Sequence, residues 1–166
     1  MPSYDTELTA LHDMISHAVS VLLADSANAV KQALMERSVT KLAIFFGKQK
    51  ANDVILSHMI TFLNDKEDAQ LRLSFYENIV GVAAFVGWQC SPILLPLLQQ
   101  GLSDPEEFVI TRCINTMATL TSLQLLQKVN LYELLKETTP YLLHPNLWIR
   151  QATADFVAST ANILDG

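Results

Sequence analysis

The sequence has little charge and few of the residues on which catalytic and metal sites depend. Only 17% of its 166 residues are charged, against about 25% in typical soluble domains. It has four histidines and two cysteines. Two cysteines are too few for a disulfide scaffold, and Cys90 and Cys113 lack the spacing of a metal site. Together with a half-hydrophobic composition, this favours a well-packed chain in a reducing, cytoplasmic setting.

The sequence also lacks a basic stripe, a secretory signal and an uninterrupted membrane span. Its net charge of −6 is spread evenly along the chain, so we expect no nucleic-acid binding. Acidic residues interrupt the N-terminus, which argues against a secretory signal. Residues 78–103 carry no charge, but glycines, prolines and glutamines interrupt them. We therefore interpret them as two buried helices around a turn, with no direct insertion into a membrane.

No combination of residues has the spacing of a catalytic centre. His12 and His17 are five residues apart, which does not suit a metal site on one helix face. Ser57 and His58 are neighbours and point in different directions on a helix, so they cannot act as nucleophile and base. The acidic run 65–68 lacks the glycine of a calcium loop. The sequence thus predicts no catalytic residue, no metal and no cofactor.

What the sequence does contain is a repeat of about forty residues. Asp25, Asp65 and Asp104 each close a short apolar segment, at spacings of 40 and 39. Such a period is typical of stacked helical hairpins. The apolar pattern predicts helices near 4–24, 27–46, 50–63, 67–86, 92–102, 105–124, 130–143 and 146–164. We predict an all-α, right-handed α-solenoid of about four HEAT- or armadillo-like hairpins, in one domain over 1–166 with repeats near 4–46, 50–86, 92–124 and 130–164.

A polar ladder is predicted along this stack. Each recurring aspartate is expected to accept hydrogen bonds from the start of the second helix of its hairpin. A basic residue further along that helix would pair with an aspartate of the adjacent repeat. The predicted ladder residues are Asp25, Lys31, Asp65, Arg72, Asp104 and Arg150. The ladder is partial, because Thr111 and Leu143 occupy the corresponding places in the later repeats.

Two local patterns make more detailed predictions. The run 104–107 predicts a helix start with Asp104 as the cap, Pro105 at the first helical position and Glu107 closing a capping box. The three- and four-residue spacing of apolar residues in 4–24 predicts one buried face on the first helix. That face consists of Leu8, Leu11, Ile15, Val19 and Leu22.

Two groups of residues are candidates for binding a partner. Trp88 and Trp148 lie near predicted turns, where aromatic side chains often anchor protein interfaces. The alternative is that they pack between repeats. The second group is the polar cluster at the first turn between repeats, and its alternative is an ordinary solvated loop. It consists of Lys48, Gln49, Lys50, Asn52 and Asp53.

Several longer runs resemble one known family. Residues 45–65, 79–89, 96–104, 106–110 and 144–150 are similar to the HEAT-repeat region of the regulatory subunit of class III phosphatidylinositol 3-kinase, the vacuolar protein sorting fifteen family. Residues 1–40 and 113–143 match only loosely. The family combines an N-terminal kinase-like domain, central HEAT repeats and a C-terminal WD-repeat propeller. None of the kinase motifs occurs here, so the resemblance implies a non-enzymatic middle segment.

The resemblance further implies a scaffold role in autophagy and endosomal sorting. The implied partners are the catalytic lipid kinase subunit and a Beclin-type coiled-coil subunit. The implied location is cytoplasmic, peripheral on endosomal and autophagosomal membranes through the parent complex. Two alternatives remain: a HEAT or armadillo adaptor of another complex, such as a transport receptor or phosphatase scaffold, and a small helical enzyme with a site near His58.

Overall fold

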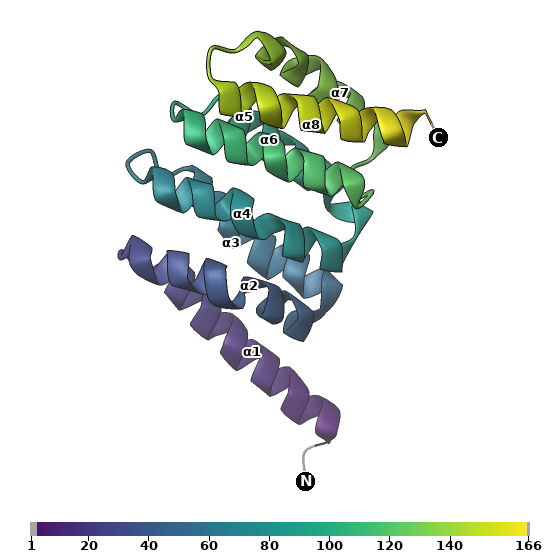
Figure 1. The fold of residues 1–166 in the computed structure, drawn as a ribbon. Coiled ribbons are helices and arrows are strands. Elements are labelled where there is room, and N and C mark those ends of the chain that lie inside the picture. Colours follow the sequence, from purple (N-terminus) through teal and green to yellow (C-terminus); the bar gives the residue numbers. More distant parts are fainter. Residues whose placement is uncertain (1–2, 166) are drawn as a thin grey trace.

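The regular structure is helical throughout residues 3–165, which the computed structural model describes (Figure 1). No strand occurs in this range. The all-α, solenoid-like fold class is therefore confirmed. The elements are α1 (Tyr4–Leu23), α2 (Asn28–Lys50), the π-helical η1 (Ala51–Leu56), α3 (Ser57–Leu63), α4 (Ala69–Val86), the 3-10 helix η2 (Trp88–Cys90), α5 (Ser91–Leu102), α6 (Glu107–Ser122), α7 (Lys128–Thr138), the 3-10 helix η3 (Thr139–Leu143) and α8 (Leu147–Leu164).

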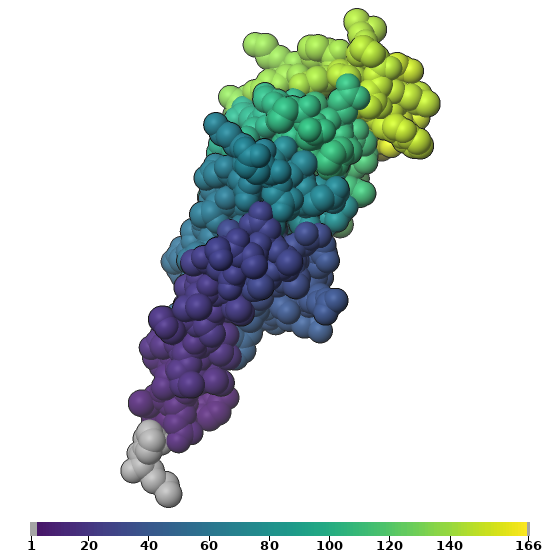
Figure 2. All heavy atoms as spheres, turned by 90° about the vertical axis from the view of Figure 1, so that its left-hand side faces the viewer, coloured from purple at the N-terminus to yellow at the C-terminus, as the bar shows by residue number. Residues whose placement is uncertain are grey.

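The helices form two layers that run the length of an elongated molecule. Helices α2, α4, α6 and α8 pack against one another in sequence order, and Figure 1 shows them as one layer with α3, α5 and α7 behind. In Figure 2 the colours follow one another from end to end, so segments close in sequence also lie close in space. Helices α4 and α6 thus contact a neighbour of the same layer on both sides, whereas α2 and α8 each contact one.

One continuous core joins the hairpins. It extends from Val19 in α1 to Phe156 in α8. In α4, Phe75 and Ile79 are almost fully buried, as expected for a helix covered on both sides. No hairpin therefore has a separate core, and each one covers the apolar surface of the next.

Two glycines are required by local geometry. The backbone leaves helical geometry at Gly47, where φ is +82° and ψ is 166°, and the first helix of the next hairpin starts there. At Gly101 in α5, a Cβ atom would lie 2.5 Å from both the Cys113 Sγ and the Tyr76 hydroxyl oxygen. Its missing side chain lets α5 approach α4 and α6 closely.

Two predicted helices differ from those observed. Where one helix was expected over 50–63, the chain forms the π-helical η1 followed by α3. Over 130–143, α7 ends at Thr138 and a 3-10 helix follows, with Pro140 near its start. Proline lacks the N–H that would continue the α-helical pattern, which accounts for this change. Among residues 3–165, no helix is long and apolar enough to cross a membrane.

The predicted buried face of the first helix is wrong for most of its length. Val19 is buried and Ile15 is partly buried against the core, but Leu8, Leu11 and Leu22 are exposed. Figure 1 shows the N-terminal part of α1 extending past the rest of the stack. Periodicity identified an apolar face, but only Ile15 and Val19 of that face pack against the core.

The predicted start of the helix after Asp104 is also wrong in detail. Helix α6 begins at Glu107, with Glu106 at the N-cap position and no side-chain cap. Pro105 therefore lies before the helix, and Glu107 does not close a capping box. The Asp104 carboxylate accepts the Glu106 N–H at 2.9 Å and tightens the turn instead. The Asp104 carboxylate also accepts two hydrogen bonds from Arg72, so it is not free to cap the helix.

Candidate interaction surfaces and the inter-repeat polar ladder

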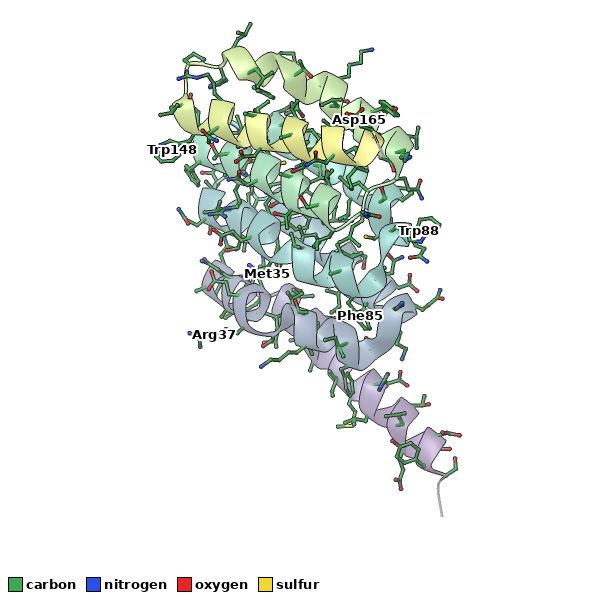
Figure 3. The ribbon with its side chains drawn as sticks, turned by 45° about the vertical axis from the view of Figure 1, so that its right-hand side comes forward. Met35, Arg37, Phe85, Trp88, Trp148 and Asp165 are labelled. Atoms are coloured by element: carbon green, nitrogen blue, oxygen red, sulfur yellow. The ribbon has the colours of Figure 1, made fainter. Side chains whose placement is uncertain are left out.

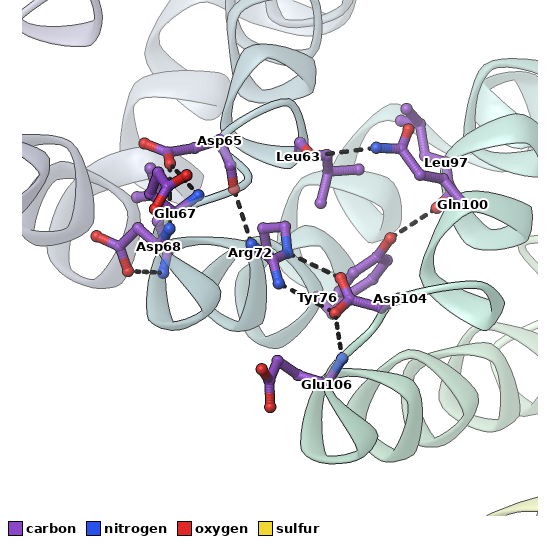
Figure 4. A network of polar contacts seen from close by, with 11 residues as sticks. Leu63, Asp65, Glu67, Asp68, Arg72, Tyr76, Leu97, Gln100, Asp104 and Glu106 are labelled. Atoms are coloured by element: carbon purple, nitrogen blue, oxygen red, sulfur yellow. Dashed lines mark hydrogen bonds and ion pairs between the residues drawn. The ribbon is translucent and has the colours of Figure 1, made fainter.

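Arg72 and Asp104 form a buried ion pair between adjacent hairpins (Figure 4). Arg72 Nε donates to Asp104 Oδ2 at 2.8 Å, and Nη2 donates to Oδ1 at 3.1 Å. Each side chain is only 6% exposed. Nη1 donates to the Asp65 carbonyl oxygen at 2.8 Å, so the guanidinium is held from both sides. The hydrogen bonds to Asp104 raise the pKa of Arg72 above its usual value. The ladder prediction for adjacent repeats is thus met at this position.

Asp65 lies at the preceding rung and has a different partner from the one expected. The amide nitrogen of Asn28 donates to Asp65 Oδ2 and to Asp68 Oδ2, both at 2.9 Å. Asp65 Oδ1 accepts the backbone N–H groups of Glu67 and Asp68, each at 3.1 Å. The Asn28 amide and, to a lesser extent, these N–H groups and the charge of Lys31 lower the pKa of the Asp65 carboxyl.

Lys31 and Asp25 depart from the predicted ladder. Lys31 acts on Asp65 through its charge, and no carboxylate in residues 3–165 lies within 4.0 Å of its amine. Asn28, which lies nearer the start of α2, binds the Asp65 carboxylate in place of Lys31. Asp25 accepts the Ala27 N–H at 2.7 Å, whereas Ala27 itself is the N-cap residue of α2. The carboxylates at 25, 65 and 104 therefore stabilise the turns rather than cap the helices directly.

Asp68, and not Asp65, caps α4. Its Oδ1 accepts the Leu71 N–H at 3.0 Å, and both residues lie at the start of that helix. The acidic run 65–68 therefore serves the start of α4. Among residues 3–165, no group of three or more His, Cys, Asp and Glu residues could hold a metal ion.

Arg150, the last predicted ladder residue, is anchored on its own turn. Nη1 donates to the carbonyl oxygens of His144 and Pro145 at 2.9 and 3.0 Å. Within the described part of the chain, no carboxylate lies within 4.0 Å of its guanidinium. Arg150 is half-buried at the start of α8.

Sequence reasoning missed several contacts between repeats, and two of them join buried residues one repeat period apart. The Thr116 hydroxyl donates to the Tyr76 carbonyl oxygen at 2.7 Å, forty residues away. The Ser91 hydroxyl donates to the Asn130 side-chain oxygen at 2.8 Å, across thirty-nine residues. Both pairs are buried, and both spacings equal the repeat period. Polar residues one period apart were the signal that could have revealed them.

The predicted polar cluster is only partly assembled. Lys48, Gln49 and Asn52 line one side of a shallow pocket of about 290 Å³, with Val86 and Gln89 on the other. Gln89 follows Trp88, whose side chain is 55% exposed, so one of the two candidate tryptophans is next in sequence to this pocket. The other two members behave differently: Lys50 lies 3.9 Å from Asp13 of α1, and Asp53 is exposed outside the pocket.

Trp148 lies at the opposite edge of the molecule from Trp88 (Figure 3). It is 70% exposed, which contradicts the alternative that it packs between repeats. Asn146 caps α8 by accepting the Trp148 N–H at 2.8 Å, and its amide also donates to Glu107 of the previous hairpin at 2.6 Å. The start of α8, which carries Trp148, is therefore tied to the start of α6.

Trp148 lines a pocket that the sequence did not reveal. This pocket, of about 260 Å³, opens along the outer faces of α4, α6 and α8, and its other apolar walls are Leu73 and Phe108. Arg112 also lines it and pairs with Glu77 at 3.5 Å. Phe108 precedes Trp148 by one repeat period, and this spacing in the sequence could have predicted that the two aromatic residues lie on one edge. We refer to Leu73, Phe108, Arg112 and Trp148 as the Trp148 edge.

The comparisons with known proteins agree on one family. The family described as PIK3R4-like, middle domain, matches residues 1–166. The probable serine/threonine-protein kinase vps15 of Dictyostelium discoideum is 40% identical over 97% of this chain and 8% of its own length. Serine/threonine-protein kinases vps15 of Schizosaccharomyces pombe and VPS15 of Arabidopsis thaliana are 37% and 34% identical, over 95% and 96% of this chain and 9% and 11% of theirs.

These matches also show which part of the relatives is present. The chain spans about a tenth of the length of each, and it matches a middle domain rather than a kinase domain. The resemblance found in the sequence is therefore confirmed at the level of the family. This chain belongs to the PIK3R4-like middle-domain family, the Vps15 group of regulatory-subunit proteins.

Proposed function

We propose that this chain is a non-catalytic scaffold segment of the regulatory subunit of the class III phosphatidylinositol 3-kinase complex. In this role it mediates protein–protein interactions for autophagy and endosomal sorting. Its partners are the catalytic lipid kinase subunit and a Beclin-type coiled-coil subunit. It acts in the cytoplasm, peripheral on endosomal and autophagosomal membranes through the parent complex, and no nucleic acid or cofactor takes part.

The observation that carries this proposal is the buried connection between successive hairpins. The ion pair of Arg72 and Asp104 joins one hairpin to the next, and each of the two side chains is 6% exposed. One core extends through the stack. Packed interiors resist deformation, so domains attached to such a stack keep their spacing. Family membership indicates the complex in which this stiffness would be used.

The exposed aromatic residues support a binding role for the flanks. Trp148 and Phe108 are 70% and 42% exposed beside a preformed pocket, with the half-exposed Arg112 next to them. Tryptophan and arginine dominate the binding energy of many protein interfaces. We therefore assign the Trp148 edge as the first candidate for partner contact, and Trp88 with the neighbouring pocket of Lys48, Gln49, Asn52, Val86 and Gln89 as the second.

Co-purification tests the proposal. The chain is expressed with the lipid kinase subunit and the Beclin-type subunit, and affinity is measured for the unchanged chain, Trp148→Ala and Trp88→Ala. We expect the unchanged chain to recover at least one subunit and Trp148→Ala to weaken binding roughly thirtyfold, as at a central interface residue.

Leu123→Ala is the matched control, because Leu123 is 51% exposed but lies outside the Trp148 edge. It should bind as the unchanged chain does. Failure of the unchanged chain to recover either subunit would refute the proposed function. Normal binding by both tryptophan variants would be compatible with the scaffold function but would refute the assignment of the two tryptophans as partner contacts.

A further inference from the structure

We propose that the Trp148 edge binds an extended acidic peptide, in which an apolar side chain and a carboxylate are separated by one residue. The apolar side chain packs against Phe108 and Trp148, and the carboxylate pairs with Arg112. This inference deepens the proposed scaffold function and rests on it, because it gives the chemistry of the partner segment that binds at this edge.

The binding site is a groove along helices α4 and α6. The pocket lined by Trp148 and a neighbouring pocket of about 250 Å³ share Arg112 and Asn115, so the two form one continuous hollow. Along α6 this hollow extends from Phe108 to Thr119, which corresponds to roughly 16 Å of helix. An extended peptide rises about 3.3 Å per residue, so the groove has room for about five residues.

The charge of the Trp148 pocket favours an acidic ligand. Among the residues that the structure describes, Arg112 is the only charged one that lines this pocket, in a protein whose net charge is −6. Its side chain is 47% exposed, and its ion pair with Glu77, which lines only the neighbouring pocket, is loose at 3.5 Å. Within residues 3–165 the Arg112 guanidinium makes no hydrogen bond, whereas all three nitrogens of Arg72 donate one. Arg112 therefore has donors available for a two-point contact with a carboxylate.

Asn115 can recognise the main chain of such a peptide. It is half-buried, and in the described part of the chain only its main-chain carbonyl oxygen is used, by the Thr119 hydroxyl at 3.1 Å. The Asn146 amide, on another wall of the pocket, instead donates to Glu107. A side-chain amide offers a donor and an acceptor to the unpaired main-chain groups of an extended peptide, whereas those of a helix are already paired. The free Asn115 amide therefore favours an extended segment over a docked helix.

The apolar end of the groove suits one large side chain. Phe108 and Trp148 are 42% and 70% exposed, and Leu73 completes the apolar lining. Aromatic rings such as these bury a large area against another ring or an aliphatic side chain. Asn146 ties the start of α8 to α6, so both aromatic walls are in place before a ligand binds, which lowers the ordering cost of binding.

Helix α6 sets the spacing of the two ligand groups. Arg112 follows Phe108 by four residues, which corresponds to roughly 6 Å along the helix axis. Residues two apart in an extended peptide are separated by about 6.6 Å and point to the same face. A helical ligand would need the same two groups four residues apart. We therefore expect an apolar residue and an Asp or Glu with one residue between them.

Peptide display tests this inference. The chain of residues 1–166 is immobilised, and a library of random nine-residue peptides is selected against it. We expect the enriched sequences to share an aromatic residue or leucine separated by one residue from Asp or Glu. Against Arg112→Glu, the acidic position should change to Lys or Arg, because the charge of the pocket is reversed. An arginine with a merely structural role would not exchange the charge of the ligand in this way.

Fluorescence anisotropy with the most enriched peptide, labelled at one end, measures the contribution of each group. Arg112→Gln should weaken binding roughly tenfold and Asn115→Ala roughly fivefold, as for the loss of a charged and a neutral hydrogen bond. Replacing the acidic residue of the peptide by its amide should match the effect of Arg112→Gln. Arg37→Gln is the matched control, because Arg37 is an exposed arginine of α2 outside the groove, and it should bind as the unchanged chain does.

Several results would overturn the inference. These are the absence of any enriched sequence, enriched sequences without an acidic residue, apolar and acidic positions four residues apart as in a helical ligand, and equal binding by Arg112→Gln. The selection uses no other subunit, so its failure leaves the co-purification result intact. A failed co-purification would likewise leave the peptide result intact.

Discussion

A buried arginine is stable in this stack because each of its three guanidinium nitrogens donates a hydrogen bond. Arg72 is 5% exposed, yet Asp104 and the Asp65 carbonyl oxygen accept its hydrogen bonds. Burying a charge without such partners is costly, and a half-satisfied pair is worse than none. The residue therefore holds two hairpins together while depending on both.

Arg72→Met should destabilise the protein strongly. The change leaves the Asp104 carboxylate buried without its cation, a loss of about 3–5 kcal/mol in comparable pairs. Urea unfolding measures the free energy of unfolding. Arg112→Met, in the half-exposed pair with Glu77, should cost less than about 1 kcal/mol. Equal costs for the two variants would contradict the structural role of Arg72.

The Asp65 carboxyl should titrate below its usual pKa of 3.8, because Asn28 and two backbone N–H groups stabilise its charged form. Its contribution to stability is then fully present above the unfolded pKa of about 3.9 and is lost as the pH falls through the lower folded value. An NMR titration of the carboxyl carbon measures this pKa directly. Asn28→Ala should raise it toward 3.8, and an unchanged pKa would show that the amide has no such effect.

At the scale of elements, the central helix α4 of the first layer depends on two neighbours, α2 and α6. Ile79 in α4 is fully buried between them, whereas Ile44 in α2 is 57% exposed. Ile79→Ala should therefore cost roughly 2–5 kcal/mol through the cavity it leaves. Ile44→Ala is the matched control, with an expected cost below about 1 kcal/mol. Urea unfolding of both variants compares them, and an unchanged midpoint for Ile79→Ala would refute the assignment of α4 as the centre of the core.

The same scale shows what the sequence could predict. Periodicity and the forty-residue repeat identified the helices and their stacking, because both depend on local apolar spacing. The first helix was interpreted wrongly, because spacing shows that Leu8 and Leu11 form a face with Val19 but not which part of that face meets α2. Which part of the face is buried depends on where the neighbouring helices end.

Side-chain partners were harder to predict than helices. The pairing of Arg72 with Asp104 followed from the repeat, but Asn28 in place of Lys31 did not. A short amide one turn earlier reaches the same carboxylate, and only three-dimensional distance distinguishes the two. The Trp148 edge was found only in part for the same reason: its other walls come from two other helices, α4 and α6.

At the scale of the whole molecule, the proposed function requires that the ends keep a fixed separation. Repeat stacks transmit strain through contacts between neighbouring hairpins, so one weak interface makes the whole stack flexible. The continuous core and the buried Arg72 pair span the central interfaces. We therefore predict a stiff body whose stiffness is lost when one such contact is removed.

Pulsed electron spin resonance between two labelled positions measures this most directly. Lys41→Cys in α2 and Ala161→Cys in α8 place exposed thiols far apart along the stack. The native Cys90 and Cys113 are buried, and burial raises the pKa of the Cys90 thiol to about 11, so both should stay unlabelled at neutral pH. We predict a single narrow distance distribution that broadens in Arg72→Met. A broad distribution in the otherwise unchanged chain would contradict a rigid scaffold.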